Sequence, residues 1–200
     1  LISLNGTKKL AIILTLIALV VAGSILYFVN PANSSGVIQM AVAGLFLGYF
    51  YTARPLRLVA RRGLGEIAIF LSFGPLLTLG AGFAMYDGVF SESIHFLNCL
   101  LLGIPLGLLT TNILLINEFP DMNSDAKTGK NHLVVTFGKK ASRWIYLFIL
   151  LLAIASSFYL YTKLESISLL VPTSFCLLFG LHIFKNMYIN YNKRSLVNSN

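Results

Sequence analysis

The chain has 200 residues, of which 56% are hydrophobic and only 11% are charged. Because a soluble domain usually carries about a quarter charged residues, this composition excludes the soluble class and indicates a membrane protein. The net charge of +8 could suggest a nucleic-acid partner. The basic residues cluster between apolar segments, however, which indicates membrane topology and argues against nucleic acid.

Six apolar segments follow one another along the chain. They cover residues 10–29, 37–53, 66–85, 95–116, 143–162 and 166–184. Each is close to the roughly 20 residues that a helix needs to cross a bilayer. None alternates apolar with polar residues, as the strands of a membrane barrel would. We therefore predict an all-α fold, a polytopic bundle of transmembrane helices that forms one domain over residues 1–200.

The basic residues support this arrangement of spans. Six spans place fourteen of the fifteen lysines and arginines on one side of the membrane and leave only Lys163 on the other. The fourteen are Lys8, Lys9, Arg54, Arg57, Arg61, Arg62, Lys127, Lys130, Lys139, Lys140, Arg143, Lys185, Lys193 and Arg194. Because basic loops stay in the cytoplasm, we predict a multi-pass protein of the cell membrane with this side cytoplasmic.

The segment between the second and third spans is rich in arginine. Arg54, Arg57, Arg61 and Arg62 lie there, just before Glu66. The planar guanidinium group matches the oxygens of a phosphate, so this loop is a candidate diphosphate-binding segment. Alternatively, the arginines only set the topology and contact anionic lipid head groups. Glu66 is placed to cap the N-terminus of the helix that follows it.

A group of oxygen-bearing side chains closes the fourth apolar segment. Only seven carboxylates occur in the chain, and three of them lie within residues 117–125. Asn117, Asp121 and Asp125 are spaced four residues apart, so on a helix they share one face. Mg²⁺ prefers such oxygen ligands, usually one or two carboxylates together with phosphate oxygens of a substrate. The pattern predicts a site for a diphosphate and Mg²⁺ at the membrane surface.

The residues around this group add further expectations. Pro120 should interrupt the helix just before Asp121. Lys127 and Lys130 follow closely, and their charges would neutralise a departing diphosphate. The alternative is a solvated loop in which these charges only pair with one another. His132 is a lone loop histidine, for which exposure to solvent is the usual situation.

Four segments together resemble the UbiA superfamily of intramembrane prenyltransferases. They are the stretch Tyr51–Leu58 (YTARPLRL), the stretch Gly63–Glu66 (GLGE), Phe73–Pro75 (FGP), and the pattern that runs from Asn117 through Asp121 and Asp125 to Gly129 and Lys130. The branch that these segments resemble most is the 1,4-dihydroxy-2-naphthoate polyprenyltransferases of menaquinone biosynthesis. The resemblance implies nine spanning helices around a cavity open to the membrane, in which a polyprenyl diphosphate binds through two Mg²⁺ ions.

The resemblance also implies roles for individual residues. Asn117, Asp121 and Asp125 match the second of two Asp-rich motifs in the superfamily and would bind metal and diphosphate, with Asp121 and Asp125 as catalytic residues. Lys130 matches a basic position after that motif. The remaining substrate-binding candidates are Lys127, Tyr51, Arg54 and Arg57, which would hold the diphosphate or the aromatic acceptor.

One part of the superfamily pattern has no counterpart here. The first Asp-rich motif is missing, because no Asp occurs before Asp87 and Asp87 falls on the opposite side of the membrane. We expect that the chain is a fragment, truncated at both ends, with about six of nine spans, and that it is inactive alone.

The expected function is Mg²⁺-dependent transfer of a polyprenyl group from polyprenyl diphosphate to an aromatic acceptor, 1,4-dihydroxy-2-naphthoate. Three alternatives remain open. The acceptor could instead be 4-hydroxybenzoate, haem, a chlorophyll precursor or an archaeal glycerol lipid. A membrane transporter could use Asp121 and Asp125 as a cation site, although such sites usually lie nearer the middle of the bilayer. A non-catalytic scaffold is the third.

Overall fold

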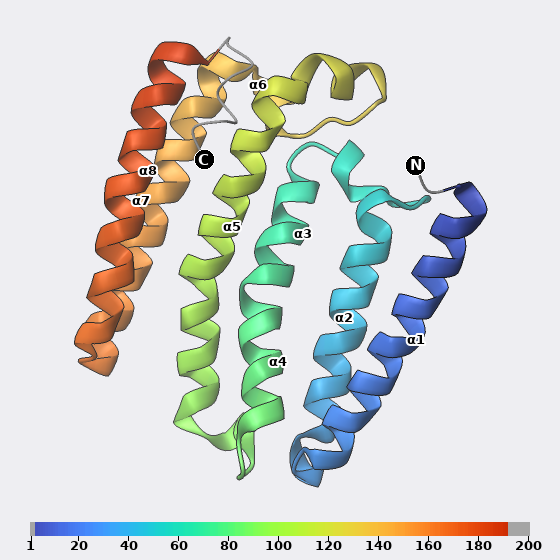
Figure 1. Cartoon of the computed structure of the whole chain (residues 1–200). Helices are drawn as coiled ribbons and strands as arrows, with labels where there is room; N and C mark the ends of the chain where they lie inside the picture. The colour runs from blue at the N-terminus through green and yellow to red at the C-terminus, as the bar shows by residue number, and fades with distance from the viewer. Residues whose placement is uncertain (1–2, 192–200) are drawn as a thin grey trace.

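The structure is a computed structural model that describes residues 3–191, and these form a bundle of helices (Figure 1). The α-helices are α1 (Leu4–Phe28), α2 (Ser34–Thr52), α3 (Leu64–Phe73), α4 (Pro75–Met85), α5 (Ile94–Lys127), α6 (Leu133–Phe137), α7 (Lys139–Leu164) and α8 (Leu170–Asn190). Four short 3₁₀ turns join them: η1 (Pro31–Asn33), η2 (Leu58–Ala60), η3 (Phe90–Glu92) and η4 (Ile167–Leu169). The described residues contain no β-strand, so the predicted all-α fold is confirmed.

Six segments of the described chain are long and apolar enough to cross a membrane, as the sequence predicts. They cover Leu4–Phe28, Pro31–Thr52, Leu64–Met85, Ile94–Lys127, Lys139–Leu164 and Ile167–Asn190. Consecutive segments run in opposite directions, so the loops that carry the basic residues meet at one end of the bundle (Figure 1). Two of the basic residues used in the topology prediction, Lys193 and Arg194, lie outside the described residues.

The third span differs from its prediction, because it consists of two helices. Helix α3 ends at Phe73 and α4 begins at Pro75, with Gly74 between them at φ −107° and ψ −105°. A proline is well suited to the first position of a helix, where its missing N–H is not needed. A side chain at Gly74 would collide with the backbone of Gly103 and Gly107 on α5. The break therefore lies where α5 approaches this span most closely.

Helix α5 is central to the bundle, since it packs against α3 and α4 on one side and against α7 on the other (Figure 1). Its buried Leu115, Ile116 and Phe119 form a core with residues from α6, α7 and α8. Helix α1 lies at the edge beside α2 in Figure 1 and has no buried residue. Many large apolar side chains on the outside of the bundle are exposed, as expected for surfaces that face lipid.

The expectation that Pro120 interrupts the helix is wrong. Helix α5 continues through both Pro105 and Pro120 to Lys127. A proline removes only one N–H donor from a helix, and its φ is helical, so the helix can continue where the neighbouring residues are well packed. Phe119 and Ile116 are 1% and 2% exposed, and this burial holds the backbone on both sides of the missing hydrogen bond.

Candidate functional site

The candidate ligands Asn117, Asp121 and Asp125 all lie on the last turns of α5. Their spacing places them along one side of the helix, as predicted. Asn117 and Asp121 are exposed, whereas Asp125 is half-buried. The three side chains therefore share a helix face but differ in environment, and Asp125 is the least exposed of them.

Both carboxylate oxygens of Asp125 have partners in its own segment. Oδ1 lies 2.8 Å from Nζ of Lys130, and Oδ2 lies 3.3 Å from Nε2 of His132. The chain reverses after α5 at Gly129, whose φ is +75°, a conformation that suits glycine. The backbone N–H of Lys130 then donates to the carbonyl of Asp125 at 3.0 Å. The Gly129-Lys130 pair of the sequence pattern is therefore the turn that brings the lysine back to the carboxylate.

His132 lies at the centre of a buried polar cluster, so the expectation that it is solvated is wrong. Its ring is only 2% exposed, and Nδ1 lies 3.2 Å from Oε2 of Glu118, which is itself buried. When the ring is protonated, it forms ion pairs with Glu118 at Nδ1 and with Asp125 at Nε2. A ring without the Nδ1 proton can accept from the backbone N–H of Val135 at 3.4 Å and so cap α6.

The environment of His132 favours its charged form. Burial of the ring lowers the pKa, but the hydrogen bond to Glu118 and the negative charges of Glu118, Asp125 and Glu66 outweigh it, so the pKa is raised above its ordinary value. The sequence analysis gave no role to His132 or Glu118. Glu118 directly follows Asn117 and so lies about 100° further round the helix, on the side of the core. This position in the helix could have indicated from the sequence that Glu118 is buried and needs a polar partner.

Glu66 joins the α2–α3 side of the site to α6. It lies in the first turn of α3, where a negative charge complements the helix N-terminus, but its side chain makes no capping hydrogen bond to that helix, so the expected cap is absent. Its Oε1 instead accepts the backbone N–H of Leu133, the first residue of α6, at 2.5 Å. Glu66 is 3% exposed, and this part-buried hydrogen bond ties the two segments together.

The arginine loop contacts the turn after α5 directly. Arg57 has a positive φ of 41°, and its Nη2 donates to the carbonyl of Thr128 at 3.0 Å. Asn131 donates to the carbonyl of Ala60 at 3.3 Å and makes a second link. Arg61 instead binds carbonyls of its own loop, at Leu56 (2.6 Å) and Pro55 (3.3 Å). The loop is therefore folded onto the end of α5.

The remaining predicted residues divide into two groups. Tyr51 is half-buried near the cluster, since a side chain at Gly65 would lie 3.6 Å from its ring. Arg54 and Lys127 are exposed at the surface. Of the predicted substrate-binding residues, only Lys130 contacts Asp125 directly. Arg57 contacts the neighbouring turn at Thr128, and Arg54 and Lys127 are exposed.

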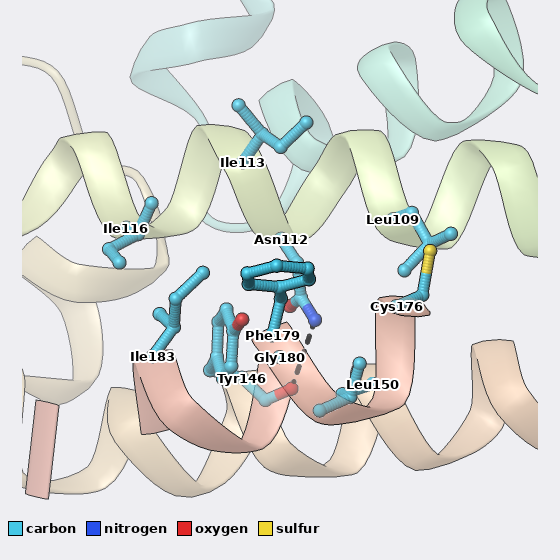
Figure 2. A pocket seen from close by; sticks show the side chains of 10 residues that line it. All are labelled: Leu109, Asn112, Ile113, Ile116, Tyr146, Leu150, Cys176, Phe179, Gly180 and Ile183. Carbon is cyan, nitrogen blue, oxygen red and sulfur yellow. Dashed lines mark hydrogen bonds between the residues drawn. The ribbon is translucent and has the colours of Figure 1, made fainter. Parts of the chain in front are cut away.

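An apolar pocket of about 320 Å³ lies among α5, α7 and α8 (Figure 2). Its lining includes Ile113 and Ile116 of α5, and Ile113 precedes Asn117 by one helical turn. Asn112 also lines it, and its Nδ2 donates to the carbonyl of Tyr146 at 3.1 Å (Figure 2). An apolar space therefore begins just inside the membrane from the polar end of α5.

The side chains that could hold a metal are the oxygen ligands at the end of α5. Within residues 3–191, no group of three or more His, Cys, Asp or Glu side chains is arranged to bind an ion. The exposed oxygens of Asn117 and Asp121 nevertheless fit Mg²⁺ in its usual mode, with few protein ligands and the rest from phosphate or water. The donor set is therefore compatible with Mg²⁺ that is bound together with a phosphorylated ligand.

Comparison with known proteins identifies the family. Residues 1–197 match the model of the UbiA prenyltransferase family. The chain belongs to the UbiA prenyltransferase family. The six apolar spans and the position of the Asp-rich segment at the end of α5 are consistent with this membership, and the resemblance found in the sequence is confirmed.

Several curated relatives of this UbiA family member are similar to it at low identity. The chain is 30% identical over 144 residues to a 2-carboxy-1,4-naphthoquinone phytyltransferase of Arabidopsis thaliana, covering 70% of this chain and 37% of that protein. It is 31% identical over 157 residues to a 1,4-dihydroxy-2-naphthoate octaprenyltransferase of Haemophilus influenzae (76% and 47%). It is 31% identical over 109 residues to a chlorophyll synthase of Avena sativa (54% and 27%). The chain thus spans less than half the length of these relatives, and no solved structure matches it.

Proposed function

We propose that the protein transfers a polyprenyl group from polyprenyl diphosphate to an aromatic acceptor at the membrane surface. The observation that carries this proposal is the composition of one end of α5. There Asn117 and Asp121 expose oxygen ligands, while Lys130 is held beside Asp125 in a chain of the UbiA family. Side-chain oxygens can bind Mg²⁺, and a nearby positively charged side chain can bind the phosphate oxygens, so together they suit a Mg²⁺–diphosphate complex.

Each residue at this end has a part in handling the diphosphate. Asn117, Asp121 and Asp125 would hold Mg²⁺, which when bound offsets the charge that develops on the diphosphate as the carbon–oxygen bond breaks. Lys130, which contacts Asp125, adds a positive charge for the diphosphate. Arg57 uses one of its five N–H donors on Thr128, so others remain for phosphate oxygens.

The apolar part of the molecule suits the prenyl chain. A diphosphate at Asn117 leaves its chain one helical turn away from Ile113 and the pocket of Figure 2. An allylic cation formed near that boundary is shielded from water by the lipid and the apolar side chains. The acceptor ring would then attack the cation and lose a proton, while diphosphate leaves towards the polar end.

The names of the relatives support an aromatic acceptor of the naphthoate type. Two of the three relatives described above are named for naphthoquinone or dihydroxynaphthoate substrates, so we propose 1,4-dihydroxy-2-naphthoate and a role in menaquinone biosynthesis. Because one relative is named a chlorophyll synthase, a chlorophyll precursor is the second candidate for the acceptor. The excess of basic residues at the end that carries Asp121 supports a cytoplasmic location for this end.

The test uses the full-length protein in membranes. Labelled polyprenyl diphosphate is offered with 1,4-dihydroxy-2-naphthoate, with and without Mg²⁺, and lipid-soluble product is measured. We expect product only with Mg²⁺, and a loss of at least about 100-fold in the Asp121→Ala variant. Asp87→Ala is the matched control, since Asp87 is exposed at the opposite end. Equal product from Asp121→Ala and the unchanged protein would reject the role of Asp121.

A further inference from the structure

The cluster behind Asp125 contains two side chains that the proposed function does not use. His132 and Glu118 are 2% and 6% exposed, and their contacts run in one line from Glu118 through His132 to Asp125 and Lys130. Burial of ionisable groups is costly unless they are paired. A cluster of this kind beside a candidate site therefore calls for a role.

The contacts of Asp125 set the direction of the argument. One oxygen is 2.8 Å from the ammonium of Lys130 and the other is 3.3 Å from the His132 ring, so the carboxylate is engaged on both sides. Its side chain is 15% exposed, whereas that of Lys130 is 39% exposed. The lysine is therefore the member of this line that reaches the surroundings.

The two faces of α5 explain why Glu118 can support this line without meeting a ligand. Asn117 and Asp121 are exposed, whereas Glu118, the residue after Asn117, is buried and points to the His132 ring. Asp125 lies one turn beyond Asp121 and bridges the two environments. The ring thus stands between a buried carboxylate and the carboxylate that contacts Lys130.

We infer that His132, supported by Glu118, is a positioning residue that fixes Asp125 so that Asp125 presents the Lys130 ammonium to the diphosphate. This inference rests on the proposed function, because it names the group that the lysine serves.

If His132 only capped α6, a variant that keeps the cap would be harmless even without the contact to Asp125. His132 also lies at the N-cap of α6, where Nδ1 is 3.4 Å from the N–H of Val135. In His132→Asn, a side-chain oxygen can still cap α6, because Asn is among the best N-cap residues, but the side chain is too short to reach Asp125. His132→Ala removes both interactions. The pair of variants separates the cap from the contact with Asp125.

The experiment measures steady-state kinetics and binding on the full-length protein. We expect His132→Asn to keep the melting temperature but to raise KM for polyprenyl diphosphate about 10-fold. This is within the range for residues that orient the side chains in contact with a ligand. Glu118→Ala should raise KM in the same direction. The shift in melting temperature that Mg²⁺ with inorganic diphosphate produces should fall in both variants, which gives a readout independent of turnover.

The lysine supplies the decisive control. If His132 acts through Lys130, then His132→Asn should have less than about a twofold further effect in a Lys130→Met background, because coupled residues are not additive. The inference would be overturned if the effects of His132→Asn and Lys130→Met on KM multiplied in the double variant. It would also be overturned if His132→Asn left KM and diphosphate binding unchanged. The Mg²⁺ requirement and the Asp121→Ala loss test the proposed function without involving His132, so the two can fail separately.

Discussion

Arg57 donates from Nη2 to the backbone carbonyl of Thr128 at 3.0 Å, and this contact joins two loops that are 71 residues apart in the chain. One loop follows α2, and the other follows the Asp-rich end of α5. The contact fixes the arginine loop over the turn that contains Gly129, close to the point where Lys130 meets Asp125. The geometry of the diphosphate end therefore depends on both loops.

The Arg57 contact gives the first prediction. Arg57→Ala should lower the free energy of unfolding by about 1 kcal/mol, because it removes a hydrogen bond from a charged donor that is half-buried. Arg57→Gly should be more stable than Arg57→Ala, because glycine adopts the φ of +41° without strain. Thermal unfolding in detergent measures both. Both variants should raise KM for polyprenyl diphosphate, since neither has the guanidinium group.

Arg54→Ala is the control for that experiment, because Arg54 is in the same loop but exposed. Its melting temperature should match that of the unchanged protein. An Arg57→Gly variant as unstable as Arg57→Ala would show that the positive φ carries no cost here.

The close approach of α5 to the break between α3 and α4 gives the second prediction. A side chain at Gly107 would collide with the backbone carbonyl and ring of Phe70. Gly107→Val should therefore destabilise the fold by about 2 kcal/mol or more, since the helices must separate to admit it. Gly44→Val is the matched control, because a side chain at Gly44 meets nothing within 4 Å. Similar melting temperatures for the two variants would contradict the tight contact.

The features that could be predicted from the sequence are those that depend on composition and local spacing. Hydropathy and charge were sufficient for six spans and for the end at which the basic loops meet, because both depend on composition over many residues. The four-residue spacing of Asn117, Asp121 and Asp125 likewise predicted a shared helix face. These features need no knowledge of which helices are neighbours.

Features that depend on neighbours were missed. The third span breaks at Gly74, where Gly103 and Gly107 approach it. Helix α5 continues past Pro120 because Ile116 and Phe119, on both sides of the missing hydrogen bond, are buried. His132 is buried because Glu118 lies on the core side of α5. Each outcome depends on a tertiary contact between residues far apart in sequence or on different faces, which local patterns do not encode.

The third prediction concerns Asn33, at the end of the bundle opposite the Asp-rich motif. Its Oδ1 accepts the N–H of Phe90 at 3.0 Å, and its Nδ2 donates to the carbonyls of Tyr86 and Gly88. Because Asn33 is fully buried, Asn33→Ala leaves these groups without partners and should cost about 2 kcal/mol of stability. KM for polyprenyl diphosphate, measured below the new melting temperature, should not change. A large change in KM would show that the two ends are coupled.

The last prediction tests how α6 is held against α3. Glu66 accepts the N–H of Leu133 through a part-buried contact at 2.5 Å. Glu66→Gln keeps an oxygen acceptor in this position and should change the free energy of unfolding by less than about 1 kcal/mol. Glu66→Leu leaves the N–H buried without a partner and should cost about 1–3 kcal/mol. Because Leu133 follows His132 directly, only the leucine variant should also weaken the binding of Mg²⁺ with inorganic diphosphate. Equal binding by both variants would mean that the position of α6 does not affect the Asp125–Lys130 pair.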